Sequence, residues 1–421
     1  MNAPLALGID IGTSGVRTAV IDSDRTVVSM ARADHLSTAA SDATAWWDAV
    51  QRALHAQARA LLENGIDPRS IDRLAVDGTS GSMVLVDRSL NPLTRALYYN
   101  TAGFDAEAAF IARFAPNGAI TRGSGSALAR ALHLREQVKA DHSWQLLHQA
   151  DFIVAKLAGG SLGSDDNNAL KLGWDPERRS WPDWFEALHL SDAVLPAVER
   201  PGTAVGTISA KVASEFGFNP DLTIHAGTTD SIAAFLASGA DEIGDGVTSL
   251  GTTLAIKLLS ERRIDEPDLG IYSHLVRGRW LAGGASNTGG GVLASLFSQQ
   301  ELVELSGKID PEIERDLGYY PLAKPGERFP VNDPHLAPRL EPRPTSDHEF
   351  LHAVFEAMAR IEAEGYQKLE ALGAPRLVRM FTAGGGANNA VWRQIRSRHL
   401  GVSSQTPHHQ EAAVGAASLC F

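Results

Sequence analysis

The residues best suited to chemistry lie in a turn near the start of the chain. Residues 5–22 show two apolar stretches joined by Asp10-Ile11-Gly12-Thr13-Ser14-Gly15, the pattern of a β-hairpin. Glycine lets backbone N–H groups approach an anion, hydroxyls add donors, and a carboxylate at a strand end can hold a metal ion through water. This combination suits a nucleotide phosphate, and the alternative is an ordinary hairpin with a solvated Asp10.

The same pattern recurs in the second half of the chain. Residues 247–258 again show an apolar strand, a turn made of Gly251, Thr252 and Thr253, and a second apolar strand. Gly251 follows Gly12 by 239 positions. A repeat on this scale predicts two related lobes, each presenting a phosphate-binding hairpin to a shared cleft.

A third polar position of interest is Asp230, which follows Gly227-Thr228-Thr229 where a strand ends and a helix begins. A carboxylate there can accept the proton of a substrate hydroxyl as that hydroxyl attacks phosphorus. The helix N-terminus would stabilise its ionised form. The alternative is a helix N-cap, a common role for aspartate.

Three other polar segments have two interpretations each. The glycine run 384–386, with Asn388 and Asn389 after it, could hold a planar base or a ribose, or could form a tight strand-to-helix turn. Thr79 and Ser80 follow another strand and could meet a polyol or form a plain turn. Asp165 and Asp166 could bind a cation, but a solvated loop is favoured.

Composition limits the class of protein. A chain of 421 residues, 44% hydrophobic and 21% charged, has material for two ordinary domains. Its net charge of −12 argues against nucleic acid or an anionic membrane as a partner. Cys420 is the only cysteine, and no secretory segment opens the chain, so we expect a cytoplasmic protein.

The elements that must position these residues follow from hydrophobic periodicity, and strand, helix and strand in succession predict an α/β domain. The patterns predict strands over 26–32, 71–76, 83–87, 224–227 and 378–382. They predict helices over 45–63, 145–157, 231–237, 350–372 and 391–399, and a polar loop over 164–173. Glycines and acids without an apolar period over 238–246 mark the boundary between the lobes.

Six segments, in order along the whole chain, resemble the FGGY family of carbohydrate kinases. They are GIDIGTSG, GTTDSIAAF, SLGTT, GGASNTGGG, AGGGANNAVW and EAAVGAA. The resemblance implies two actin-like (ribonuclease H-like) α/β domains flanking a catalytic cleft, and ATP- and Mg²⁺-dependent phosphorylation of a sugar. We assign residues 1–240 to the sugar-binding and catalytic domain and 241–421 to the nucleotide-binding domain.

The resemblance also implies roles for the matching residues. Asp230 would be the general base, and Asp10 would lie near the metal ion, the phosphates and the sugar. The residues expected along the phosphates are Gly12, Thr13, Ser14, Arg17, Gly251, Thr252 and Thr253. Those expected at the nucleoside end are Gly290, Gly385, Gly386 and Asn389.

The expected substrate depends on departures from the family pattern. Typical xylulokinases carry Gln-Met-His-Gly where this chain has Asp77-Gly78-Thr79-Ser80-Gly81. DGTSGS, SDDNNALKLGW and AGTTDSIAAFLASGA look most like the small cyanobacterial and plant-type ribulokinases. We therefore predict D-ribulose as the substrate, contacted by Ser80, Asp10 and Asp230, in a monomer or homodimer. The alternatives are xylulose or another pentose or polyol and, more remotely, a non-catalytic ATPase of the actin or heat-shock-chaperone kind.

Overall fold

The structure is a computed structural model that describes residues 4–36, 42–139, 143–190, 194–384 and 389–421. The chain forms two compact units. Unit 1 comprises Met1–Ala237 together with Glu411–Phe421, and unit 2 comprises Ser238–Gln410. The division between residues 240 and 241 that we expected from the sequence differs from this one mainly at residues 411–421, which pack in unit 1.

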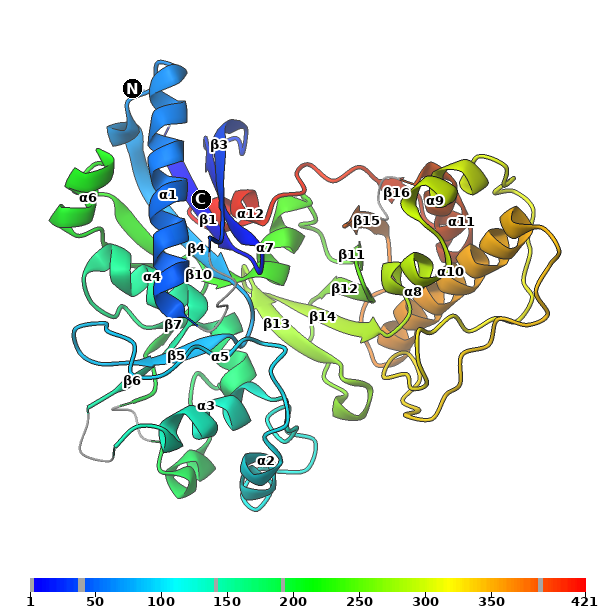
Figure 1. The fold of residues 1–421 in the computed structure, drawn as a ribbon, viewed down its shortest axis with the longest axis horizontal. Helices are drawn as coiled ribbons and strands as arrows, with labels where there is room; N and C mark the ends of the chain where they lie inside the picture. The colour runs from blue at the N-terminus through cyan, green and yellow to red at the C-terminus, as the bar shows by residue number, and fades with distance from the viewer. Residues whose placement is uncertain (1–3, 37–41, 140–142, 191–193, 385–388) are drawn as a thin grey trace. The chain divides into compact units, whose positions relative to one another are not determined.

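Unit 1 is built on a six-stranded mixed sheet of order β3-β2-β1-β4-β10-β9 (Figure 1). Its strands are β1 (Leu5–Ile11), β2 (Gly15–Ile21), β3 (Val27–Asp34), β4 (Ile71–Gly78), β5 (Met83–Val86), β6 (Gln145–His148), β7 (Ser164–Asp165), β8 (Val198–Glu199), β9 (Ala204–Thr207) and β10 (Thr223–Thr229). Its helices are α1 (Ala43–Glu63), α2 (Asp105–Ile111), α3 (Ala127–Glu136), α4 (Gln149–Ala158), α5 (Asp166–Leu172), α6 (Ala210–Phe216), α7 (Asp230–Ala237) and α12 (Ala412–Ser418), with short 3₁₀ turns at Pro68–Ser70 and Asp183–Leu188.

The predicted first hairpin is confirmed: β1 and β2 pair antiparallel, and β4 adds to β1 in parallel. β1 is buried along its whole length because α1 and α12 contact the strands of this hairpin and cover its apolar side chains. β10 joins β4 in parallel, so the carboxyl ends of β1, β4 and β10 meet at one edge.

The terminal helix α12 packs backbone to backbone in unit 1, which explains its run of small residues. A Cβ atom on Gly8 of β1 would lie 1.8 Å from the carbonyl oxygen of Ala413. A Cβ atom on Gly415 would lie 1.8 Å from the carbonyl oxygen of Ala233 in α7. Only glycine permits these two approaches, so the EAAVGAA segment is required by packing.

Unit 2 repeats the hairpin arrangement in a sheet of order β13-β14-β12-β11-β15-β16. Its strands are β11 (Asp245–Leu250), β12 (Leu254–Ser260), β13 (Tyr272–Val276), β14 (Arg279–Ser286), β15 (Arg379–Ala383) and β16 (Ser404–Gln405). Its helices are α8 (Gly290–Leu296), α9 (Gln299–Ser306), α10 (Asp347–Ala371) and α11 (Ala390–Leu400), with a 3₁₀ turn at Pro267–Leu269. Between α9 and α10, residues 318–344, which contain seven prolines, form no helix or strand.

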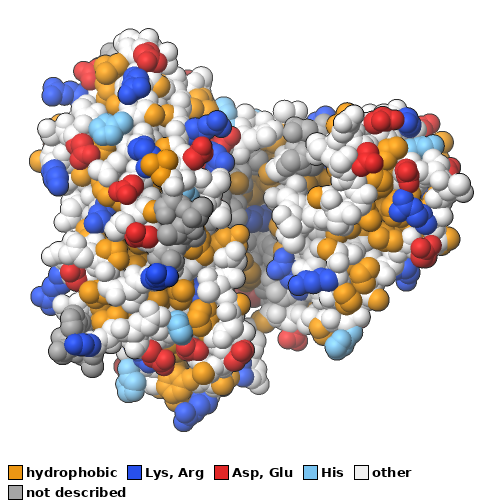
Figure 2. Space-filling view, viewed as in Figure 1, with side chains coloured by type: hydrophobic (Ala, Val, Ile, Leu, Met, Phe, Trp, Pro, Cys, Tyr) orange, Lys and Arg blue, Asp and Glu red, His pale blue; other side chains and the backbone are white. Residues whose placement is uncertain are grey.

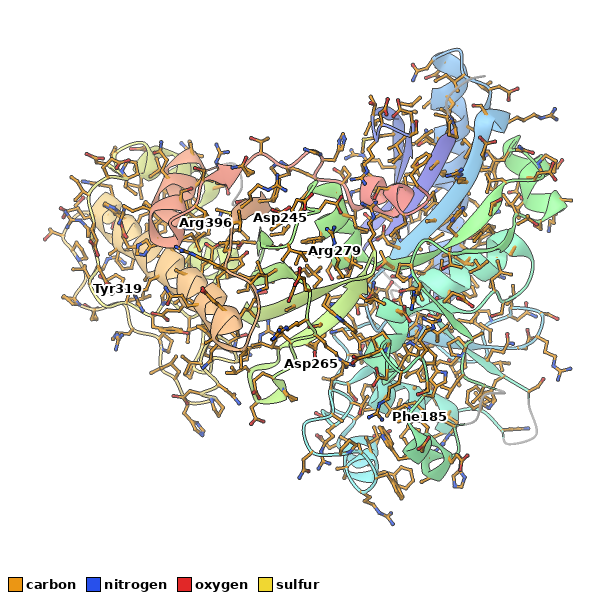
Figure 3. All side chains as sticks on the ribbon, turned by 180° about the vertical axis from the view of Figure 1, so that it is seen from behind. Phe185, Asp245, Asp265, Arg279, Tyr319 and Arg396 are labelled. Atoms are coloured by element: carbon orange, nitrogen blue, oxygen red, sulfur yellow. The ribbon has the colours of Figure 1, made fainter. Side chains whose placement is uncertain are left out.

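A buried ion pair joins the sheet of unit 2 to its helices. Arg396 of α11, labelled in Figure 3, donates from Nε to Oε2 of Glu362 on α10 at 2.6 Å. Its second nitrogen donates to Oε1 at 2.7 Å, and its third to Oγ1 of Thr382 on β15 at 2.7 Å. Both side chains of the pair are completely buried.

Two predicted elements were wrong. Residues 145–157 begin as strand β6 and become helix α4 only at Gln149, because Leu146 and Leu147 pair with β5. Residues 164–173 are not a polar loop: they form strand β7 and helix α5, whose polar side chains are buried.

Acidic, basic and apolar side chains are interspersed on the face shown in Figure 2. No helix among the described residues is long and apolar enough to cross a membrane.

Candidate active site

Three carboxylates gather at one edge of the unit 1 sheet. Asp10 lies one residue before the end of β1, Asp77 one residue before the end of β4, and Asp230 directly after β10. The strand register pairs Asp10 with Asp77, and Asp77 with Thr228. Because these three strands are parallel neighbours, their carboxyl ends place the acids side by side, which is a usual location for a ligand site in an open α/β sheet.

Asp10 and Asp77 are neighbours across the two strands and meet little water. Asp77 is completely buried and Asp10 is 5% exposed. Burial, followed by the neighbouring Asp10 carboxylate, raises the pKa of Asp77 well above its ordinary value, and burial also raises the pKa of Asp10. Two neighbouring carboxylates cannot both ionise easily, and the larger rise in the pKa of Asp77 favours ionisation of Asp10 first. Asp77 was not among the site residues predicted from the sequence, although it lies near the end of a buried strand just as Asp10 does.

The turn after β1 places the other predicted residues of the first hairpin. The N–H of Gly12 donates to the carbonyl of Gly15 at 3.0 Å, which closes the turn and leaves Thr13 and Ser14 exposed. Arg17 contacts the Asp10 carboxylate at 3.3 Å and Glu411 at 3.4 Å. The predicted phosphate-binding residues of unit 1 therefore surround Asp10.

Asp230 is the first residue of α7 and is partly exposed. Its Oδ1 accepts a hydrogen bond from the N–H of Ser231 at 2.6 Å. This contact and the helix N-terminus both favour the ionised carboxylate, the form that can accept a proton. The helix-terminus interpretation and the base interpretation are therefore compatible at this residue.

The turn after β4 carries Ser80 and is held from several sides. The amide oxygen of Gln149 accepts from the N–H of Thr79 at 2.9 Å and from its hydroxyl at 2.7 Å. Arg130 of α3 donates from Nε to the carbonyl of Gly81 at 3.1 Å. Its guanidinium is buried, which lowers the pKa of Arg130 to about 10. The hydroxyl of Ser80 is buried and has no protein partner in the structure.

Asp165 and Asp166 serve the fold, so the favoured hypothesis of a solvated loop is wrong. Oδ1 of Asp165 caps α5 by accepting from the N–H groups of Asn167 at 2.8 Å and Asn168 at 3.0 Å. Asp166 forms an ion pair with Arg179 at 3.0 Å. Asn168 in turn donates from Nδ2 to the carbonyl of Thr228 at 3.2 Å, so this helix braces the strand end that precedes Asp230.

Unit 2 contains a pocket of about 800 Å³ at the ends of β11 and β15. Gly251, Thr252, Gly290 and Asn389, all predicted nucleotide contacts, line it. Its walls are largely apolar and include Phe297, Leu302 and a stacked pair, Phe355 and Trp392, whose ring centroids are 5.0 Å apart. A concave, mostly apolar pocket with a few polar groups suits a planar base and its sugar.

Two of these residues also hold the pocket together. The N–H of Gly290 donates to the carbonyl of Gly251 at 2.7 Å, and a Cβ atom on Gly290 would lie 2.6 Å from that oxygen. Asn389 caps α11 by accepting from the N–H of Trp392 at 3.0 Å and donates to Ser306 at 2.8 Å. Thr253 follows in the hairpin turn, and Gly385 and Gly386 lie outside the described residues.

The chain resembles proteins of one family over nearly its whole length. It is 25% identical to the xylulose kinase of Escherichia coli over 98% of this chain and 89% of the relative, and 26% identical to that of Streptomyces rubiginosus over 99% and 87%. A ribulokinase 2 of Staphylococcus saprophyticus is 22% identical over 50% of this chain and 44% of the relative.

Solved structures share the fold. A protein of Brucella ovis described as a xyloylose kinase superposes with a TM-score of 0.85 at 20% identity, covering 99% of this chain and 89% of that one. A gluconate kinase of Lactobacillus acidophilus gives 0.82 at 18% identity, covering 100% and 89%. Residues 5–113 match the N-terminal domain of the FGGY family of carbohydrate kinases, and residues 246–421 match its C-terminal domain. The chain therefore belongs to the FGGY family of carbohydrate kinases.

Proposed function

We propose that this sugar kinase transfers the γ-phosphoryl group of ATP to a hydroxyl of a ketopentose, and that D-xylulose is the preferred substrate. The observation that carries the reaction is the set of strand-end carboxylates, Asp10, Asp77 and Asp230, in a chain of the kinase family. The choice of sugar is supported by the names of the relatives that align over nearly the whole chain.

D-ribulose, our expectation from the sequence, becomes the second candidate. The comparisons favour it less, because the relative called a ribulokinase aligns with only half of the chain. The observation in its favour is the Asp77-Gly78-Thr79-Ser80-Gly81 turn, which departs from the stretch expected in xylulokinases at a position beside the carboxylates. A different turn at this place would present different hydrogen-bonding groups to the sugar.

In the proposed mechanism, Asp230 accepts the proton of the attacking sugar hydroxyl. Phosphoryl transfer has a loose transition state, so the protein contributes mainly position and charge stabilisation. Asp230 supplies a partly exposed, ionised acceptor. Asp77 has the more strongly raised pKa, so Asp10 would be the charged member of the pair, and Arg17 beside Asp10 offers a cation to phosphate oxygens.

The residues present fit a magnesium ion that arrives with the nucleotide. Mg²⁺ is usually held by one or two carboxylates, several waters and substrate phosphates. Asp10 provides such a carboxylate at the strand end. Among the described residues, no three His, Cys, Asp or Glu side chains are arranged so that they could hold a metal ion by themselves. When bound, the ion would neutralise charge on the phosphates, and Asp10 would hold it through water.

The nucleoside part of ATP is proposed to occupy the pocket of unit 2. Its apolar walls would cover the base, while the exposed backbone of Gly251 and Thr252 would face the phosphates. Asp230 is proposed to act on the sugar hydroxyl and not on the nucleotide, so its substitution should separate the chemical step from nucleotide binding.

The direct test is an ADP-release assay of the purified chain with D-xylulose, D-ribulose, xylitol, D-arabinitol, glycerol and gluconate. We expect the highest kcat/KM with D-xylulose and a measurable rate with D-ribulose. A higher kcat/KM with D-ribulose would reverse the order of the two candidates. Activity confined to glycerol or gluconate, or to no sugar at all, would overturn the ketopentose proposal.

A further inference from the structure

Buried polar atoms without protein partners gather where β4 and β10 end. They include both carboxyl oxygens of Asp77, the hydroxyls of Ser80 and Thr229, and Nε2 of Gln149. Thr229 pairs with Gly78 across the two strands, and Gln149 contacts Thr79, so these groups surround one turn. An unpaired buried polar group costs about 1–3 kcal/mol. Such a concentration beside the catalytic carboxylates indicates groups that await a polar ligand.

Within this set, the orientation of Gln149 is fixed. Gln149 opens α4, is completely buried, and accepts two hydrogen bonds from Thr79. A backbone N–H can only donate, so the amide oxygen must face Thr79 and the amide nitrogen must face away from it. That nitrogen therefore presents its donors to a place where no acceptor of the described residues lies within hydrogen-bond distance.

We propose that Gln149 is a specificity-determining residue that donates from Nε2 to the keto oxygen of the sugar, directly or through one bridging water. The proposal rests on the proposed ketopentose kinase function. A keto oxygen only accepts hydrogen bonds, so it needs a donor. The neighbouring Asp10 and Asp230 carboxylates also only accept and cannot supply one. Ser80 and Thr229 can turn to donate or to accept, so Gln149 is the group here whose donor direction is locked.

Two substitutions separate this donor from the structural contact to Thr79. Gln149→Met keeps the length of the side chain and removes both functions. Gln149→Glu keeps an oxygen for Thr79 and replaces the donor by an acceptor. The exposed Gln137→Glu at the end of α3 is the matched control for the change in charge. Each variant is assayed at pH 8 for the KM of the better ketopentose, the KM of ATP and the binding of D-arabinitol, which is the alditol of both ketopentoses.

We expect the ketopentose KM to rise about tenfold in Gln149→Met, as for one lost hydrogen bond in a dry site, and further in Gln149→Glu. The KM of ATP should stay within about twofold, since the nucleotide pocket lies in unit 2. D-arabinitol should gain on the ketopentose in Gln149→Glu, because a hydroxyl can donate to a carboxylate whereas a keto group cannot.

The outcomes discriminate between roles. Two outcomes would assign Gln149 a structural role and overturn the proposal. One is that the affinities for ketopentose, D-arabinitol and ATP weaken together. The other is that Gln149→Met lowers the melting temperature and Gln149→Glu restores both the melting temperature and the ketopentose affinity. A ketopentose KM within about twofold of wild type in either folded variant would overturn it too. If the wild type itself phosphorylates no ketopentose, the proposed function fails first, and the wild-type assay reveals this before any variant is compared.

Discussion

The two sheets have the same plan at their centres but carry different residues where the strands end. In unit 1, the hairpin β1–β2 lies beside parallel β4, and Asp10 pairs with Asp77. In unit 2, the hairpin β11–β12 lies beside parallel β15, and the corresponding positions pair Ser249 with Ala383. The same backbone therefore presents carboxylates in one unit and small, weakly polar side chains in the other.

The two units also differ in whether their buried ionisable side chains have partners of opposite charge. The Asp77 carboxyl of unit 1 lies in the core without a cationic partner within hydrogen-bond distance among the described residues, and its pKa is raised. In unit 2, the buried Glu362 and Arg396 neutralise each other at 2.6 Å. Uncompensated buried acids are costly and typical of functional sites, whereas a fully bonded ion pair fits a structural role. We infer that unit 1 supplies the chemistry and unit 2 the nucleotide pocket.

The largest expected effect is on catalysis in unit 1. Asp230→Asn keeps the shape of the side chain but removes its ability to take a proton, so kcat should fall by about 10²–10⁴-fold. ATP affinity, measured by calorimetry, should barely change. Asp221→Asn, at the exposed turn before the other end of β10, is the control. Near-normal kcat in Asp230→Asn would remove this residue as the base and break the division between the units.

The next largest effect is on the stability of unit 2. Arg396→Met leaves Glu362 buried without its partner, and breaking such a pair costs about 3–5 kcal/mol. Urea unfolding should show this loss, and the double variant with Glu362→Met should recover part of it. Lys308→Met removes an exposed ion pair to Glu304 and should cost less than about 1 kcal/mol. Equal costs for the two single substitutions would contradict the structural role of the buried pair.

The next prediction concerns how the unfolding free energy depends on pH through the buried Asp165 of unit 1. Burial, and then the nearby Asp151, raise the pKa of Asp165 to about 7. The folded state then binds a proton that the unfolded chain has released, so stability falls as pH rises from about 4 to 7 and is flat above. The unfolding free energy of the wild type, relative to that of Asp165→Asn, should therefore fall by up to about 4 kcal/mol over this range. A difference that is the same at pH 5 and pH 8 would contradict the raised pKa.

The smallest effect sharpens the assignment of the nucleotide pocket. A Cβ atom on Gly251 would have open space, with Thr253 O the nearest atom at 4.0 Å, so Gly251→Val should fold normally. Its side chain would obstruct the approach of phosphates to the backbone and weaken ATP binding about tenfold or more. Gly123→Val, exposed in unit 1, is the control. Unchanged ATP affinity in a folded Gly251→Val protein would exclude this turn as a phosphate site.

The sequence by itself determined the repeated hairpins, the long helices and the family. These features depend on local patterns: alternating apolar residues around Gly12 and Gly251, and a regular apolar period in α1 and α10. Asp10 and Asp230 could be selected because each follows a recognisable apolar strand. The resemblance then supplied roles that spacing alone left open.

Only the tertiary structure decided which polar residues are buried and what they contact. Parallel pairing sets Asp77 beside Asp10, a neighbour 67 positions away in the chain. The segment 164–173 has the composition of a loop, yet Asp165 caps a helix by accepting from the backbone N–H groups of Asn167 and Asn168. Gln149 has no local pattern that marks it, since its orientation depends on hydrogen bonds from Thr79, 70 positions earlier in the chain. Local sequence encodes the period of an element, but contacts between distant segments decide whether a polar side chain is solvated, structural or available to a ligand.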